Sequence, residues 1–131
     1  MARVLVLDDD KLFGALMRRG LGQRTHEVTV TETASEARAA LAAGPFDAMV
    51  CDLILPDENG LHLLREVCAA YPAMATIAIS GGRTGAVDLL HLAQTVGVDA
   101  VVKKPLELHA FVTTVENAFI TKQIALGKRA S

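Results

Sequence analysis

Short apolar segments alternate with segments of helical periodicity along the whole chain, and this alternation constrains the fold most. The run Val4-Leu5-Val6-Leu7 is continuously apolar, which is typical of a central strand in a parallel sheet covered on both faces. Further strands are expected at about Glu27 to Thr31, Ala48 to Cys51, Thr76 to Ile79 and Ala100 to Lys103. Five such strand–helix units predict an α/β fold, because each parallel connection needs a crossover segment.

Helices are expected at about Lys11 to Gly22, from the Thr33 cap to Gly44, from Leu61 to Tyr71, from Ala86 to Gly97, and after Pro105. The segment from Thr33 to Glu36 matches a capping box, in which the threonine begins the helix and the glutamate follows three residues later. In the third helix, the spacing of Leu61, Leu64, Cys68 and Tyr71 predicts the buried face.

The second strand differs from the others, because Val28 and Val30 alternate with Thr29 and Thr31. Alternation of this kind indicates an edge strand with one face exposed. An edge position favours the flavodoxin-like doubly wound parallel sheet, with strand order 2-1-3-4-5, over the order 3-2-1-4-5. The crevice for ligands is then expected between the first and third strands.

Composition narrows the class of protein. With 131 residues, 51% of them hydrophobic, the chain predicts one folded domain at 1–120, followed by a helix extension or flexible tail at 121–131. A net charge of −2 argues against direct nucleic-acid binding. No apolar stretch approaches the length of a membrane helix, and the N-terminus lacks the layout of a signal peptide. Cys51 and Cys68 are interpreted as buried thiols, so a soluble cytoplasmic domain is expected.

Polar residues stand at the carboxyl ends of four candidate strands. Asp8-Asp9-Asp10 follows the first strand, Asp52 the third, Ser80 the fourth and Lys104 the fifth. These ends converge on one crevice in an open parallel sheet. Clustered carboxylates repel one another unless a cation is present, and a hard, oxygen-rich site suits Mg²⁺. A carboxylate neutralised in this way can attack phosphorus, with the lysine and the hydroxyl stabilising the transferred group.

The ordered segments at the strand ends carry a family resemblance. They are Val4 to Asp10, Asp52-Leu53-Ile54-Leu55-Pro56-Asp57-Glu58-Asn59-Gly60, Ile79 to Gly82, and Val102-Lys103-Lys104-Pro105. From Arg3 to about Ile120 the chain resembles a receiver domain of the two-component response-regulator family.

The resemblance implies a role for each site residue. Asp52 is then the phosphoacceptor, and Asp8, Asp9, Asp52 and the backbone carbonyl of Ile54 hold Mg²⁺. Ser80 turns toward the phosphoryl group and Lys104 forms an ion pair with it. The resemblance also implies a cis peptide bond between Lys104 and Pro105.

Two positions depart from the family pattern. Val101 stands where receivers usually carry a tyrosine or phenylalanine that changes rotamer on activation, and a valine has no ring to move. Gly81-Gly82, with Gly85 nearby, follows Ser80 where alanine is more usual. Because glycine lowers the cost of rearranging a backbone, we expect signalling to depend on movement of this loop more than on a ring flip.

Other polar residues have simpler interpretations. Asp10 is expected to act as a helix cap, and Asp57 and Glu58 as loop residues without a further role. Lys103 should point away from Lys104 by strand alternation and lie in solvent. The four histidines show no metal-ligand spacing.

The function expected from these features is that of a stand-alone response-regulator receiver. Its phosphodonor would be a sensor histidine kinase or a histidine phosphotransfer protein. Its output would be binding to an unidentified downstream protein or onward phosphotransfer, without direct nucleic-acid contact or membrane insertion. No enzymatic activity is expected beyond self-phosphorylation and slow self-dephosphorylation.

Two alternatives come from other functional classes. One is a phosphorylation-independent pseudo-receiver, an interaction module that Val101 favours. The other is a small Mg²⁺-dependent phosphatase with an aspartyl nucleophile, for which Asp8 and Asp10 have the usual spacing. The second is disfavoured, because no segment for a cap or substrate pocket is evident.

Overall fold

The protein is a three-layer α/β sandwich built on a five-stranded sheet. The structure is a computed structural model that describes residues 1–81 and 86–127, with the backbone alone for 86–90. The strands are β1 (Arg3–Leu7), β2 (Glu27–Thr31), β3 (Ala48–Asp52), β4 (Ala75–Ser80) and β5 (Ala100–Lys103). All neighbouring strands are parallel and the order is β2-β1-β3-β4-β5, which confirms the predicted flavodoxin-like topology.

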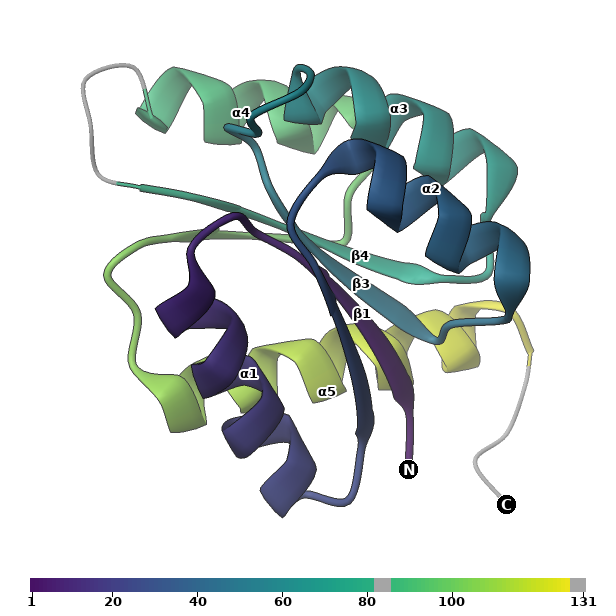
Figure 1. Ribbon diagram of the computed structural model, residues 1–131. Helices are drawn as coiled ribbons and strands as arrows, with labels where there is room; N and C mark the ends of the chain where they lie inside the picture. The colour runs from purple at the N-terminus through teal and green to yellow at the C-terminus, as the bar shows by residue number, and fades with distance from the viewer. Residues whose placement is uncertain (82–85, 128–131) are drawn as a thin grey trace.

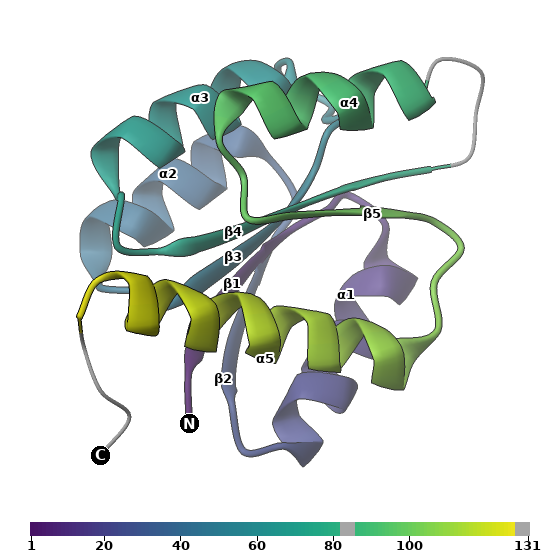
Figure 2. The same ribbon diagram turned by 180° about the vertical axis from the view of Figure 1, so that it is seen from behind.

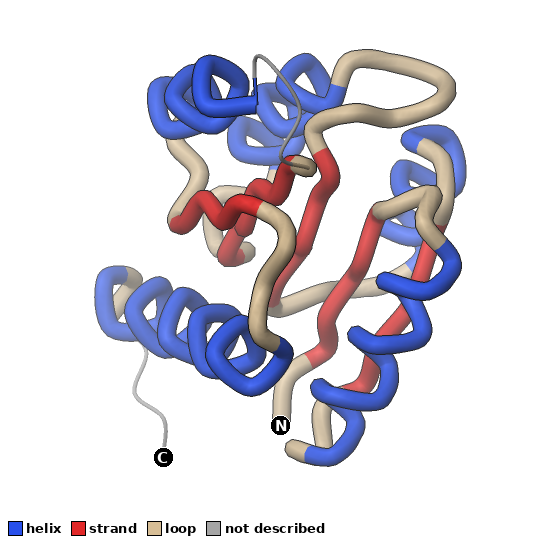
Figure 3. The backbone as a smooth tube through the Cα atoms, turned by 90° about the vertical axis from the view of Figure 1, so that its left-hand side faces the viewer, coloured by secondary structure: helices blue, strands red, loops and turns tan. Residues whose placement is uncertain are grey.

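Helices cover both faces of this sheet. They are α1 (Lys11–Gln23), α2 (Ala34–Ala43), α3 (Gly60–Ala70), α4 (Ala86–Val96) and α5 (Leu108–Ala125). In Figure 1, α2, α3 and α4 lie on one side of the sheet, and α1 and α5 lie on the other. The reverse view in Figure 2 shows the same division, with α5 crossing in front of the strands. The side view in Figure 3 shows the strands enclosed between the helices.

The period-two alternation of the strands divides the core into two clusters. Val4, Val6 and Val50 face α1 and α5, whereas Leu5 and Leu7 face α2 and α3. Every residue from Val4 to Leu7 is fully buried, because β1 has a strand on each side and helices on both faces. From Glu27 to Val30 of β2 the exposed and half-buried positions alternate, as expected for an edge strand, whereas Thr31 is buried and its hydroxyl donates to the carbonyl of Val6.

Side-chain caps begin the helices next to the sheet's carboxyl edge. Asp10 caps α1 by accepting hydrogen bonds from the backbone N–H groups of Leu12 (3.0 Å) and Phe13 (3.3 Å), which confirms its predicted role. Thr33 caps α2 by accepting from the N–H of Glu36 at 3.1 Å. The Glu36 carboxylate does not close the capping box on Thr33 and accepts from the N–H of Glu32 instead.

The predicted buried face of α3 is partly wrong. The buried side chains are Leu63, Leu64 and Val67, while Cys68 is half-buried and Tyr71 is 37% exposed. The helix ends at Ala70, so Tyr71 lies past its last turn. Leu63, Leu64 and Val67 have the three- and four-residue spacing of one helix face, which is turned away from the predicted one.

The C-terminal helix α5 continues to Ala125, past the predicted domain boundary at residue 120. The boundary itself stays a prediction. None of the helices in the described ranges is long and apolar enough to cross a membrane.

Candidate functional site

An open crevice lies at the carboxyl edge of the sheet, where β1, β3, β4 and β5 end. Its volume is about 440 Å³, and it is lined by Asp9, Asp52, Ile54, Leu55, Pro56, Gly81 and Lys104. Each strand ends at this edge because the sheet is entirely parallel, and the crossover helices return the chain to the opposite edge. Polar residues far apart in sequence are therefore brought to one place.

Three carboxylates form the acidic part of the crevice. One oxygen of each of Asp8, Asp9 and Asp52 lies within 4.8 Å of the others. Asp8 and Asp52 are buried and Asp9 is exposed. Hard oxygen donors at this spacing suit Mg²⁺, which binds carboxylate oxygens and keeps several waters. Asp10 does not contribute to this cluster, because its carboxylate caps α1.

Lys104 is the cation that faces these carboxylates. Its Nζ lies 2.6 Å from Asp8 Oδ2 and 3.8 Å from Asp52 Oδ2. The same Nζ lies 4.4 Å from the centre of the Phe13 ring, a cation–π contact. The peptide bond to Pro105 is cis, as the family resemblance implied. In this structure Lys104 therefore neutralises the buried Asp8 most directly.

The Phe13 contact was not anticipated from sequence. Phe13 reads as one of the apolar positions of α1, and it is indeed buried in the core against Phe111. Its ring also contacts the ammonium group of a lysine 91 positions later in the numbering. No periodicity in the sequence distinguishes this aromatic residue from the leucines that share its helix face.

Burial determines the acidity of Asp52. Desolvation raises its pKa from 3.8 to about 6, and the negative charge of Asp8 adds to this increase. The backbone N–H of Ile54, which donates to Asp52 Oδ1 at 3.0 Å, opposes the increase, as does Lys104. At neutral pH the carboxylate is thus mostly ionised, and its high pKa makes it a better nucleophile than an ordinary aspartate.

Ser80 ends β4 with a hydroxyl that has no partner within residues 1–81 and 86–127. Its side chain is fully buried, and its Oγ makes no hydrogen bond to any residue that the structure describes. Buried hydroxyls are nearly always hydrogen-bonded, since leaving one unpaired costs about 1–3 kcal/mol. Among the described residues, this hydroxyl has an unused donor at the carboxyl end of β4, one residue before Gly81 of the crevice lining, and an incoming oxygen can accept from it.

The β3–α3 loop, residues 53–59, forms one wall of the crevice. The N–H of Gly60 donates to the carbonyl of Leu53 at 3.1 Å, and Ile54 and Asn59 form an antiparallel bridge. A Cβ on Gly60 would lie 2.6 Å from the Leu53 carbonyl oxygen and 2.7 Å from that of Asp52. Only glycine allows α3 to begin this close to the phosphoacceptor candidate. The metal-binding role of the Ile54 carbonyl stays a prediction.

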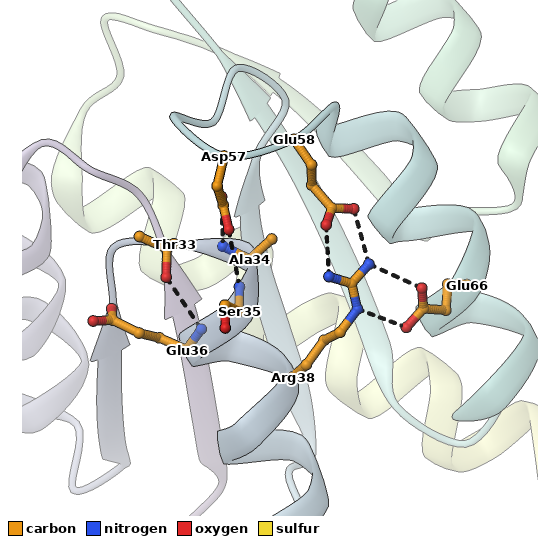
Figure 4. Close-up of polar contacts among 8 residues, drawn as sticks. All are labelled: Thr33, Ala34, Ser35, Glu36, Arg38, Asp57, Glu58 and Glu66. Atoms are coloured by element: carbon orange, nitrogen blue, oxygen red, sulfur yellow. Dashed lines mark hydrogen bonds and ion pairs between the residues drawn. The ribbon is translucent and has the colours of Figure 1, made fainter.

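The interpretation of Asp57 and Glu58 as loop residues without a further role was wrong. Asp57 accepts hydrogen bonds from the N–H groups of Ala34 and Ser35 at the start of α2. Glu58 forms a bidentate pair with Arg38 of α2. Figure 4 shows both contacts. The carboxylates lie in the loop, but their partners lie about twenty residues earlier in the sequence. The sequence around Asp57 and Glu58 therefore does not predict these contacts.

The remaining sequence predictions have mixed outcomes. Lys103 is exposed, as predicted from strand alternation. Val101 is half-buried and packs against the core cluster on the α2–α3–α4 side of the sheet. Gly81 lines the crevice, but Gly82 and Gly85 lie outside the described residues. The proposed movement of their loop on signalling therefore stays a prediction.

Comparisons with known proteins agree with this architecture. The family model described as the response regulator receiver domain matches residues 4–116. The DNA-binding transcriptional regulator NtrC of Azospirillum brasilense is 32% identical over 117 residues, which are 89% of this chain and 24% of NtrC. The TorCAD operon transcriptional regulatory protein TorR of Escherichia coli O157:H7 is 30% identical over 114 residues, which are 87% of this chain and 48% of TorR.

A solved structure shows the same fold. The response regulator receiver domain protein (CheY-like) from Methanospirillum hungatei JF-1 superposes with a TM-score of 0.88 at 23% identity. The match covers 95% of this chain and 98% of that protein. By contrast, this chain spans less than half the length of the two transcriptional regulators.

Proposed function

Because the chain belongs to the response regulator receiver domain family, we propose that it accepts a phosphoryl group from a phosphohistidine protein on Asp52, with Mg²⁺. The observation that carries this proposal is the convergence of one nucleophilic carboxylate, an acidic pair and a cation at one crevice. The hydroxyl at the end of β4 beside them has no partner among the described residues. These are the groups that phosphoryl transfer onto a carboxylate requires.

Asp8, Asp9, Asp52 and the backbone carbonyl of Ile54 are the proposed ligands of Mg²⁺. When bound, the ion supplies positive charge that neutralises the carboxylates and the phosphoryl oxygens. The donor set fits this ion, because it consists of hard oxygens and leaves part of the octahedral coordination shell to water and phosphate.

Asp52 supplies the nucleophile. Its ionised carboxylate oxygen attacks phosphorus, and the bond from phosphorus to the donor histidine nitrogen breaks as the new oxygen–phosphorus bond forms. The electron pair of the broken bond returns to the imidazole, which is then protonated. The N–H of Ile54 holds the other carboxylate oxygen at 3.0 Å, so the side chain is oriented before the donor arrives.

Lys104 and Ser80 stabilise the transferred group. The ammonium of Lys104 lies 3.8 Å from Asp52 Oδ2 and can move from Asp8 toward a phosphoryl oxygen. The unpaired Ser80 hydroxyl gains a hydrogen bond when such an oxygen is present. Phosphorylation thus changes the hydrogen-bond and ion-pair partners of Ser80, at the end of β4, and of Lys104, after β5. These changes can alter the surface formed next to β4 and β5 and so signal to a partner protein.

The proposed donor is a sensor histidine kinase or a histidine phosphotransfer protein. The proposed output is binding to another protein or onward phosphotransfer, in the cytoplasm, where the free thiols of Cys51 and Cys68 stay reduced. The relatives NtrC and TorR are transcriptional regulators, of which this chain covers 24% and 48%. Action without an output domain therefore stays a prediction. We propose no turnover of a separate small-molecule substrate, because the phosphoryl group is transferred to the protein itself and then to water or to another protein.

A phosphorylation-independent interaction module is the second candidate. The observation that favours it is Val101 of β5, which packs against the core cluster. A valine has no aromatic ring that could change rotamer when Ser80 turns toward a phosphoryl group. The phosphatase alternative is disfavoured, because the Asp10 carboxylate caps α1 and is not one of the three carboxylates that cluster at the crevice.

Incubation with acetyl phosphate, with and without Mg²⁺, tests the proposal. Intact mass measurement should show a gain of one phosphoryl group in the wild type with Mg²⁺, and no gain in Asp52→Asn. A matched control is Asp9→Asn, which keeps the nucleophile and should be modified only at higher Mg²⁺ concentration. No gain in the wild type, under conditions where another receiver is modified, would support the interaction module.

A further inference from the structure

The β3–α3 loop has two sides with different contacts. Ile54, Leu55 and Pro56 line the crevice beside Asp52. The side chains of the next two residues, Asp57 and Glu58, point toward residues of α2 and contact them (Figure 4). The loop therefore connects the phosphoacceptor crevice to a helix that supplies none of the crevice residues.

Asp57 binds the first turn of α2. Its two carboxylate oxygens accept from the N–H groups of Ala34 at 2.9 Å and Ser35 at 3.2 Å, which the end of a helix otherwise leaves unpaired. These hydrogen bonds hold the pKa of Asp57 below its usual range. Thr33 caps the same helix through the N–H of Glu36, so α2 begins with a local cap and with a second cap from the loop.

Arg38 joins three elements through one guanidinium group. It donates to both oxygens of Glu58 in the loop, at 2.5 and 2.8 Å, and to both oxygens of Glu66 in α3, at 2.9 and 2.9 Å. Two bidentate pairs use the planar donors of arginine in a way that lysine cannot reproduce. Both glutamates have a lowered pKa because of these hydrogen bonds.

We propose that Arg38, Asp57 and Glu58 are positioning residues that hold the Ile54 peptide in place at the crevice. This inference rests on the proposed function, because it assigns the Ile54 carbonyl to Mg²⁺. The N–H of the same residue already orients Asp52. One end of the loop is fixed by the sheet, through the hydrogen bond from the N–H of Leu53 to the carbonyl of Ile79 at 2.9 Å. Asp57 and Glu58 fix its tip.

The physical effect concerns the order of the loop before the metal binds. Exposed ion pairs contribute little to global stability one at a time. A loop held in its binding geometry, however, loses less conformational entropy on binding than a loop that must first be ordered. Loss of the contacts with α2 should therefore weaken metal binding more than it weakens the fold.

Arg38→Met tests this directly, and Arg24→Met is the matched control. Arg24 also forms an ion pair on the surface, at 2.7 Å with Glu116, but it follows α1 at the opposite edge of the sheet. Their side chains are 36% and 42% exposed, so the two substitutions remove similar groups. Glu58→Gln should reproduce the effect of Arg38→Met, and the double variant should add little to either, because the two residues form one network.

Three measurements distinguish positioning from a general loss of stability. The first is amide hydrogen exchange of Ile54 and Gly60 in the metal-free protein, which should be faster in Arg38→Met and unchanged in Arg24→Met. The second is the Mg²⁺ dissociation constant by calorimetry, which should rise by about 3–10-fold, below the range for buried supporting groups of metal sites. The third is acetyl phosphate modification, in which the half-saturating Mg²⁺ concentration should rise while the rate at saturation stays near that of the wild type.

Other results would contradict either the inference about the loop or the proposed function, and the measurements tell these two cases apart. Equal exchange rates and equal Mg²⁺ affinity in Arg38→Met and Arg24→Met would overturn the inference while the proposed function stands. A lower rate at every Mg²⁺ concentration, with unchanged affinity, would also overturn it, since only the folded fraction would have changed. A wild type that neither binds Mg²⁺ nor gains a phosphoryl group would instead refute the proposed function, and the exchange rates would still report on the loop.

Discussion

The negative charge on Asp52 should destabilise the metal-free protein at neutral pH, so Asp52→Asn should stabilise it. Burial raises the pKa of this carboxyl from 3.8 to about 6 in the folded state. Because the folded state binds this proton more tightly than the unfolded state, the raised pKa favours folding below about pH 4. That contribution is lost as the pH rises through about 6, where the buried group ionises. Asparagine has nearly the same shape and carries no charge.

The pKa change sets an upper limit on the effect. A shift from 3.8 to about 6 is about 2 pH units, or about 3 kcal/mol of unfolding free energy. The crevice is open to water, which screens the charge, so we expect a gain of about 1–2 kcal/mol for Asp52→Asn at pH 7.5. In a domain of this size such a gain raises the Tm by about 4–8 °C.

Thermal and urea unfolding followed by far-UV circular dichroism, in EDTA and between pH 4.5 and 8, measure this gain. Most of it should disappear by pH 4.5, where the wild-type carboxyl is protonated in the folded state. Asp9→Asn is the control, and it should change stability less because Asp9 is exposed. Added Mg²⁺ should stabilise the wild type more than Asp52→Asn. If Asp52→Asn were no more stable than the wild type at pH 7.5, or if its gain did not depend on pH, the reasoning from burial would be refuted.

Three further substitutions test other parts of the structure. Lys104→Met should destabilise the metal-free protein by about 3 kcal/mol at pH 7.5, because it leaves Asp8 buried without its cation; urea titration measures this, and Mg²⁺ should reduce the loss. Gly60→Ala should lower the rate of acetyl phosphate modification by at least about tenfold, because its Cβ displaces the Leu53 backbone beside the nucleophile; intact mass against time measures the rate. Asp10→Ala should cost about 1 kcal/mol in urea unfolding, from the lost α1 cap, and should leave Mg²⁺-dependent modification in place.

Local features of the sequence were sufficient to predict most of the fold. The continuous apolar run of β1 and the valine–threonine alternation of β2 predicted a central and an edge strand, and from these the strand order followed. The positions of Asp8, Asp52 and Lys104 at strand ends predicted that they would meet, since parallel strands share one carboxyl edge. These inferences succeed because strand period, burial and connection rules act over a few residues.

Contacts between surfaces of different elements were decided by the tertiary structure alone. His26 Nε2 lies 2.8 Å from Glu116 Oε2, 90 residues away, and no local pattern in the sequence predicted this contact. Likewise, Arg38 is one of several charged residues on α2 until α3 and the β3–α3 loop pack beside it. The sequence by itself determined the core-facing strand residues and the polar residues that end the strands, whereas the buried face of α3 was predicted only in part. Which polar side chains meet was decided by the rotation and axial position of each helix on the sheet. Both depend on how the whole core packs, and no local repeat in the sequence specifies them.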